Sequence, residues 1–482
     1  MKTHRPFESM LALATLAAFF LPPVALPAQN PSKLPKNIDL PDEDPKDRLL
    51  DLGVKSFRVN YGRRPAIDQH KVAKWGPTEF ESPDYAIYAH KILPIATAPI
   101  HDGVVLISKG KIIAVGKRGH VEVPEGFEKV DVGDGWLLPG FIDLHSHIAG
   151  KTWDLNDMVH QTNPELRTLD LVGMHHDLMA RALLGGVTSL LYIPGSGTNM
   201  SGFGTLTKTA GRSAEEALIR FPGSLKVAQA GNPERRSGDM GFGRTGMNWG
   251  LRATLNRARK YYLKWEDYYA GKRQKPELDP SLEYLRGLFR CEYPISVHTQ
   301  VYQVCLQTMR QLRDEFGLWI FVDHGTFNAY RLAGEATKRG VPICLGPRQF
   351  MLDNVTGEMR GLASYWARGG FLGGDKPVVG VGEFGIAINT DSPVVPLEQL
   401  PLQAAMAVRL GLPARWALRG LTLNPARFIG IEHRVGSIEA GKDADLVVWT
   451  GDPLDPRCHV RRVMVNGCFY VDHDADPKSR RY

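Results

Sequence analysis

The segment Leu137–His147, LLPGFIDLHSH, constrains this chain more than any other stretch. It is a short apolar run with a Pro139-Gly140 turn signal, and it ends in two histidines one residue apart. Such a run is typical of a short buried strand. Side chains two apart on a strand point to the same side, so His145 and His147 can present both imidazoles to one cation. Imidazole nitrogen suits zinc and similar divalent metals.

Three later apolar runs also end in a residue that can bind metal. They are ISVHTQ with His298, WIFVDHGT with His324 and IAINTDSP with Asp391. An HxH pair alone is a weak signal, and a lone His298 would be interpreted as a satisfied core histidine. Asp391 precedes Ser-Pro, so it also has the sequence of a helix N-cap, a role that does not exclude metal binding. The order of the four sites is what favours a metal centre.

This order of candidate ligands along the chain resembles that of the amidohydrolase superfamily, the metal-dependent hydrolases built on a (β/α)8 barrel. A second stretch, Leu421–Trp449 (LTLNPARFIGIEHRVGSIEAGKDADLVVW), is similar to the C-terminal signature of that superfamily. It is closest to the imidazolonepropionase-like and dipeptidase-like branches. The resemblance extends from residue 85 to about residue 470. It implies a metal-dependent hydrolase of carbon–nitrogen bonds.

The rest of the chain has the pattern of an α/β fold. Short apolar runs, such as GVTSLLYIP, SLKVAQAG and VPICLGP, alternate with helical stretches such as LQTMRQLRDEFG and AAMAVRLGL. This alternation predicts parallel β/α units, here a TIM barrel over residues 139–434. Alternating runs in 85–138 and 435–475 read as short antiparallel strands. By resemblance, these two segments form one small β-sandwich domain flanking the barrel.

The resemblance also implies a division of roles. His145 and His147 would bind the more buried metal, and His298 and His324 a second one. In mononuclear relatives, the counterpart of His324 hydrogen-bonds the water or the substrate instead. Asp391 would be a ligand and also the general base. The ligand types favour zinc, one or two ions per chain, with manganese, iron and nickel as alternatives.

A lysine completes the site in many binuclear members, where a carboxylated amine bridges the two metals. Lys226 in GSLKVAQAG lies on the expected fourth strand and is similar to that lysine. The alternative is a lysine at the barrel rim, or one that binds a substrate carboxylate. Lys208 in TLTKTAG is a weaker competitor.

Two other motifs have simpler interpretations. The glycine-rich stretch Gly195–Gly204, GSGTNMSGFG, lacks the spacing of a P-loop or a dinucleotide fold. We expect a flexible βα loop that covers the third strand, with Asn199 and Arg244 as candidate substrate contacts. His175 and His176 are neighbours in a helical stretch and face different directions, so we expect them to be structural or on the surface.

The N-terminus indicates export. Lys2 and Arg5 precede an apolar stretch, Leu11–Leu21, that is too short to span a bilayer comfortably. We expect a signal peptide over residues 1–28, with an uncleaved anchor as the alternative, and a periplasmic or secreted enzyme. Residues 29–84 are rich in Pro, Asp and Lys and are interpreted as an extended arm or linker. The five cysteines are odd in number and lack CxxC spacing, which argues against a disulfide framework.

The distribution of charge argues against a nucleic-acid partner. The formal net charge of +7 is spread in short pairs without a long basic run, so we expect no nucleic-acid partner. The sequence thus predicts an exported amidohydrolase whose substrate is a small amide, cyclic amide or dipeptide. The alternatives are a mononuclear deaminase or imidazolonepropionase-like cyclic amidase and, from another class, a non-catalytic metal-binding barrel. We expect no stable membrane insertion after signal cleavage, and a homo-oligomer on general grounds.

Overall fold

The computed structural model describes residues 71–150, 155–158, 160–174, 176–234, 243–354, 356–370 and 378–474. All of them belong to the unit Arg48–Tyr482. The predicted signal peptide, residues 29–70 of the predicted arm, and His175 lie outside these residues. Within them, no helix is long and apolar enough to cross a membrane, and no disulfide joins the cysteines.

A barrel sheet positions the predicted metal ligands. Its strands follow one another in chain order, and most neighbouring pairs are parallel. The sheet closes where Ser146 forms a parallel bridge with Ser392 and the His147 amide donates to the Ser392 carbonyl at 2.8 Å. The strands are β7 (Phe141–Ser146), β8 (Val187–Tyr192), β9 (Met200–Lys208), β10 (Leu218–Ala228), β11 (Ile295–Thr299), β12 (Ile320–His324), β13 (Ile343–Leu345) and β18 (Ile386–Ile388). The predicted TIM-barrel class is confirmed.

Strand β9 departs from the predicted pattern. It runs antiparallel to both β8 and β10, and all of its residues are buried. The expected loop Gly195–Gly204 was therefore wrong in its second half, which is the first part of this strand. Gly202 explains the glycine content, because its φ is +108° and a Cβ there would lie 2.6 Å from the Leu166 carbonyl oxygen. Glycine in a strand often marks such a close backbone approach.

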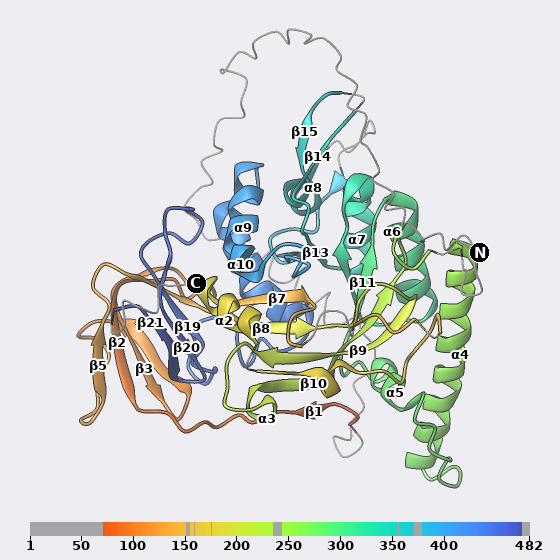
Figure 1. Ribbon diagram of the computed structural model, residues 1–482, viewed down its shortest axis with the longest axis horizontal. Coiled ribbons are helices and arrows are strands. Elements are labelled where there is room, and N and C mark those ends of the chain that lie inside the picture. The colour runs from red at the N-terminus through yellow and green to blue at the C-terminus, as the bar shows by residue number, and fades with distance from the viewer. Residues whose placement is uncertain are drawn as a thin grey trace, which may run out of the picture. The chain divides into compact units, whose positions relative to one another are not determined.

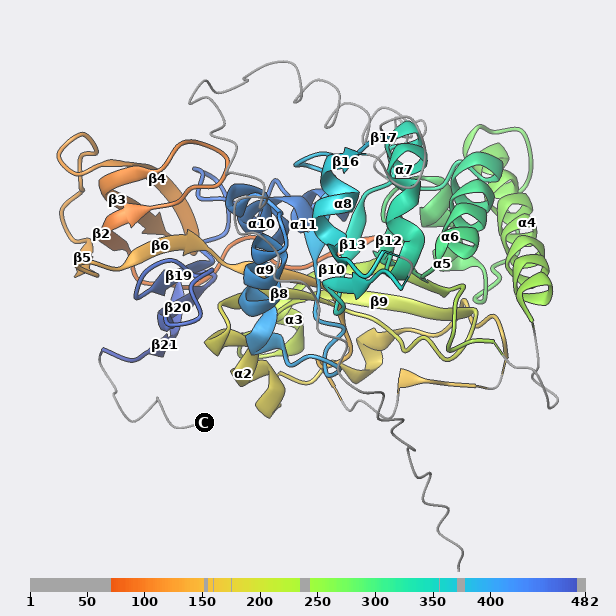
Figure 2. The same cartoon turned by 90° about the horizontal axis from the view of Figure 1, so that it is seen from above.

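Helices surround the barrel sheet (Figures 1 and 2). Helix α6 fits the predicted helical stretch and continues into a π-helical turn, Arg310–Glu315. His176 caps the start of α2, where its side chain accepts from the Leu178 amide, so its role is structural as expected. The helices are α2 (Asp177–Leu184), α3 (Ala214–Ala217), α4 (Arg244–Tyr269), α5 (Glu283–Phe289), α6 (Tyr302–Met309), α7 (Ala333–Arg339), α8 (Leu362–Arg368), α9 (Leu400–Arg409), α10 (Ala414–Leu421) and α11 (Leu423–Phe428). Two small antiparallel strand pairs follow β13, namely β14 (Phe350–Leu352) with β15 (Met359–Gly361), and β16 (Gly369–Gly370) with β17 (Val378–Val379).

A second sheet joins the two ends of the described chain. The strands before the barrel and those after it form one hydrogen-bonded sheet, in which β6 pairs with β19. Figure 1 shows β2 and β3 beside β19 and β20. Its strands are β2 (Tyr85–Ile92), β3 (Ile100–Ser108), β4 (Lys111–Lys117), β5 (Glu128–Asp131), β6 (Trp136–Pro139), β19 (Leu446–Trp449), β20 (Val460–Val465) and β21 (Cys468–Asp472). The flanking segments thus build an additional β domain, as predicted.

Buried charges link this sheet to the barrel. The Lys208 ammonium, at the end of β9, lies 3.0 Å from Asp443 and also contacts Asp445. Arg434 contacts the same Asp443 carboxylate at 2.8 Å. The end of the predicted arm is also held, since β1 (Lys74–Trp75) pairs with the start of β10. Lys208 is therefore a structural residue, and its candidacy for the metal site was wrong.

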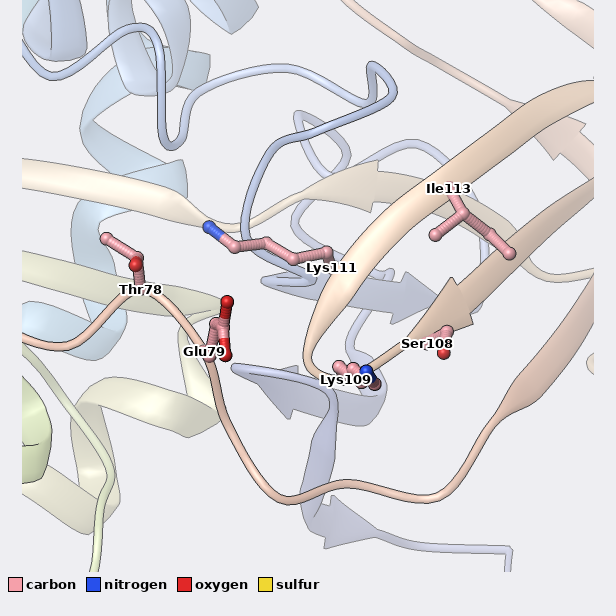
Figure 3. Close-up of a pocket in the computed structure, with 6 residues that line it drawn as sticks. All are labelled: Thr78, Glu79, Ser108, Lys109, Lys111 and Ile113. Atoms are coloured by element: carbon pink, nitrogen blue, oxygen red, sulfur yellow. The ribbon is translucent and has the colours of Figure 1, made fainter.

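The arm also borders a cavity of about 580 Å³ on the β-sheet domain (Figure 3). Its lining side chains come from the segment before β2 and from the β3–β4 hairpin, and include Glu79, Lys109 and Lys111. None of the predicted site residues lines it.

The Lys208 contacts give a stability prediction. Lys208→Met leaves the buried Asp443 and Asp445 carboxylates without their shared cation, which we expect to lower the free energy of unfolding by about 3 to 5 kcal/mol. Urea unfolding followed by circular dichroism measures this. Lys275→Met, at an exposed position, is the control and should change little. Equal unfolding midpoints for the two variants would contradict the assigned role of Lys208.

Candidate active site

The structure brings all six predicted site residues to the carboxyl ends of the barrel strands. His145 lies on β7 with His147 just beyond it, and Asp391 follows β18. One oxygen of Asp391 lies 3.2 Å from His145 Nε2 and 3.4 Å from His147 Nε2. The other three residues are Lys226 on β10, His298 on β11 and His324 at the end of β12. In a barrel of this class, this end carries the active site.

The possible ligand atoms form two overlapping groups. In one, nitrogens of His145, His298 and His324 lie within 4.8 Å of one another. In the other, His145, His147 and Asp391 meet the same limit. The sequence had assigned His145 to one metal and the pair His298 and His324 to another, whereas the structure places His145 in both groups.

The histidine rings are oriented as metal ligands. Nδ1 of His147 lies 2.9 Å from the Ile193 carbonyl oxygen, and Nδ1 of His324 lies 2.6 Å from that of Gly346. Since a carbonyl only accepts, each Nδ1 carries the proton and each Nε2 keeps its lone pair. Nδ1 of His298 lies 2.9 Å from the Ser196 hydroxyl. Bonding through the outer ring nitrogen is the usual support of a metal-binding histidine.

One ring nitrogen shows that this donor set fits a cation. Nε2 of His324 is buried and has no hydrogen-bond partner in the described part of the chain. A buried polar atom without a partner is costly, and a bound metal would remove the cost. Burial lowers the pKa of His324 to about 4 and that of His298 well below its ordinary value, so both rings are neutral at pH 7. A neutral imidazole is the form that ligates.

Lys226 differs from Lys208 in its surroundings. It is fully buried on β10, and its ammonium lies 3.2 Å from His145 Nε2. Burial lowers the pKa of Lys226 to about 8. Its position among the histidines supports the choice of Lys226 over Lys208.

The backbone of Asp391 is unusual for a side-chain-bearing residue. Its φ is +52°, in the left-handed region, and such conformations concentrate at functional sites. Burial raises the pKa of Asp391, but the nearby His145 and the close contacts with His145 and His147 outweigh this, so the pKa lies below its ordinary value. Asp391 is not the cap of the next helix, since Pro396 precedes the 3-10 turn Leu397–Gln399.

Two carboxylates near the site were missed from the sequence. Asp143 accepts from the His145 amide at 2.8 Å and from the Thr390 amide and hydroxyl at 3.0 and 2.6 Å. Burial raises the pKa of Asp143 to about 6. Asp323 is also buried, and one of its oxygens lies 3.2 Å from His145 Nδ1. A signal for both was present, because each stands one or two residues before a predicted histidine ligand.

An open cavity of about 530 Å³ lies at the carboxyl ends of β10 and β11. Arg244 and Glu234 both line it and form an ion pair at 2.9 Å. Asn199 has a different role, since its amide donates to the Ala228 carbonyl at 2.8 Å and so holds the end of β10. The remaining lining residues are Ala230, Gly231, Gln300 and Val301.

Comparisons with known proteins agree with this architecture. The model of the Amidohydrolase family matches residues 381–469. The chain is 28% identical over 406 residues to the amidohydrolase tasK of Hapsidospora irregularis, covering 77% of this chain and 40% of that protein. It thus spans less than half the length of that relative. An imidazolonepropionase of Mesorhizobium japonicum is 23% identical over 388 residues, covering 73% of this chain and 87% of that enzyme.

A solved structure also matches this chain over most of its length. The crystal structure of an amidohydrolase from Thermotoga maritima is 30% identical to this chain, with a TM-score of 0.67. The match covers 80% of this chain and 100% of that one. The barrel fold, the order of the candidate ligands along the chain and a relative that is matched along its whole length all point to one family. This chain therefore belongs to the amidohydrolase superfamily and is a hydrolase acting on carbon–nitrogen bonds.

Proposed function

We propose that the protein is an exported, zinc-dependent enzyme that hydrolyses the C–N bond of a small amide, cyclic amide or dipeptide. His145, His147, His298, His324 and Asp391 would hold the metal. The observation that carries the proposal is the Asp391 carboxylate, within 3.4 Å of two histidine nitrogens at the carboxyl ends of the barrel strands. The predicted signal peptide is the basis for export.

The chemistry divides between the metal and Asp391. When bound, a divalent cation lowers the pKa of water to about 7 and polarises the carbonyl under attack. Asp391 is ionised at neutral pH, because its pKa is below the ordinary value. It accepts a proton from the attacking water and delivers it to the leaving nitrogen, which departs as an amine. The carboxylate of Asp391 lies 3.2 Å from His145 Nε2 and 3.4 Å from His147 Nε2, which keeps it beside the site for both transfers.

Lys226 supports a binuclear site. An ammonium cannot ligate a cation, whereas the amine can add to CO₂ with loss of a proton and become a carbamate that can. The full burial of Lys226, 3.2 Å from His145, favours this modification.

The second candidate function is a mononuclear cyclic amidase of the imidazolonepropionase kind, or a deaminase. The observation that favours it is that both ligand groups share His145, so one cation can satisfy His145 together with either group. The similarity to the imidazolonepropionase of Mesorhizobium japonicum is in keeping with this alternative. Lys226 would then stay an amine.

The general base can be tested by substitution. Zinc-loaded protein is assayed with dipeptides, N-acyl amino acids and cyclic amides, and we expect one of these classes to be hydrolysed. Asp391→Asn should then lower kcat by about 10²- to 10⁴-fold, because the proton acceptor is lost. Asp267→Asn, at an exposed position on α4, should keep full activity. Unchanged turnover in Asp391→Asn would refute its role, and inactivity of the wild type on the whole panel would refute the proposed function.

Metal stoichiometry tests Lys226. Metal content per chain is measured by plasma mass spectrometry for the wild type, Lys226→Ala and the exposed control Lys275→Ala. A carbamate-bridged site predicts two equivalents in the wild type and the control, and one or none in Lys226→Ala. One equivalent in all three proteins would remove Lys226 from the site and favour the mononuclear alternative.

A further inference from the structure

His145 differs from the other three site histidines in the partner of its outer nitrogen. Nδ1 of His147 and of His324 faces a backbone carbonyl, and Nδ1 of His298 faces a hydroxyl. Nδ1 of His145 lies 3.2 Å from an oxygen of the Asp323 carboxylate, close enough for an ion pair but outside regular hydrogen-bond alignment in this structure. His145 is also the ligand that both candidate groups share, so its orientation affects the whole site.

Asp323 is placed to act on His145 and not on the metal. Neither group of candidate ligands in the described residues includes it. The Ser296 hydroxyl donates to the same Asp323 oxygen at 2.7 Å, which fixes the carboxylate. Ser296, Asp323 and His145 are all 0% exposed, so water does not compete for these contacts.

The local backbone explains how Asp323 and His324 both reach the barrel interior. Neighbours on a regular strand point to opposite sides. Here His324, the last residue of β12, has φ +70°, so the strand ends in a left-handed turn that redirects the second side chain. Asp323 and His324 can thus both contact the cluster of site histidines, each from a different side.

The imidazole of His145 lies between two carboxylates, and the Lys226 ammonium also lies 3.2 Å from its Nε2. Asp323 is at Nδ1, and Asp391 is 3.2 Å from Nε2. If the proton is on Nε2, it donates to Asp391 and blocks the nitrogen that must face the metal. If the proton is on Nδ1, the carboxylate of Asp323 is the acceptor beside it, at 3.2 Å, and the Nε2 lone pair stays free.

We propose that Asp323, held by Ser296, is a positioning residue that keeps the proton of His145 on Nδ1 and so prepares Nε2 for the metal. The inference rests on the proposed function only in taking His145 as a ligand. A carboxylate on the outer nitrogen also makes the imidazole a stronger donor, and loss of such a partner costs metal affinity.

Metal affinity is the first test, measured by zinc competition with a chromogenic chelator. Asp323→Leu removes the acceptor at similar volume and should weaken zinc binding by about 10- to 100-fold. Asp323→Asn keeps a carbonyl oxygen for Nδ1 and should restore part of the affinity. Circular dichroism and thermal unfolding identify any variant that fails to fold, and Asp267→Asn is the control. Wild-type affinity in folded Asp323→Leu would overturn the inference.

A double-mutant cycle separates this role from general damage to the site. In a His145→Gln background, Asp323→Leu should cause no further loss of zinc affinity, because the residue on which it acts is gone. An equal loss in both backgrounds would mean that Asp323 acts elsewhere and would refute the proposal.

The ring tautomer gives a readout that does not need metal. Nitrogen NMR of ¹⁵N-histidine-labelled apoprotein, at a pH where His145 is neutral, should show the proton on Nδ1 in the wild type and a shift toward Nε2 in Asp323→Leu. A proton on Nε2 in the wild type would overturn the inference. If the wild type binds no zinc but has the Nδ1 tautomer, the proposed function fails while the role of Asp323 at His145 stands.

Discussion

Asp143 joins the two ends of the barrel, and the candidate site depends on that junction. Its carboxylate accepts from the backbone of His145 on one side and from the amide and hydroxyl of Thr390 on the other. Thr390 is next to Asp391, so these bonds bring the first histidine pair and the proposed base together from opposite ends of the barrel sequence. Because Asp143 is fully buried, the bonds are shielded from water and hold the geometry more firmly than surface contacts would.

The rings of the four site histidines are also oriented by residues outside the candidate ligand set. Three of the four site histidines, His147, His298 and His324, have a hydrogen-bond partner at Nδ1, and Nδ1 of His145 lies 3.2 Å from Asp323. These groups come from the ends of neighbouring strands and the loops after them. Ser196, for example, follows β8 and holds His298 of β11. A metal site of this kind is preorganised, because the fold fixes ring orientation before any ligand arrives.

Much of this could be predicted from the sequence. Strand ends in a parallel barrel meet at one face, so histidines and an aspartate at the ends of apolar runs are brought together by the topology itself. That is why His145, His147, His298, His324 and Asp391 could be found without a structure. The two flanking β segments could also be assigned to one domain, but through the resemblance to the superfamily and not through periodicity.

Other features depend on contacts that a sequence pattern does not contain. Lys226 and Lys208 both lie near the ends of apolar stretches, and only their partners, His145 in one case and Asp443 with Asp445 in the other, separate them. Strand β9 was missed because its glycines resemble a loop, although they allow close packing against neighbouring backbone. Asp323 was missed because strand alternation places it opposite His324, and the left-handed turn at His324 breaks that rule.

X-ray absorption at the zinc K-edge of the zinc-loaded protein shows whether histidine Nε2 atoms and Asp391 bind a divalent cation. We expect a first shell of nitrogen and oxygen at about 2.0 to 2.1 Å, with the multiple-scattering pattern of several imidazoles. A sulfur shell at about 2.3 Å, or a shell of oxygen without imidazole scattering, would contradict this expectation.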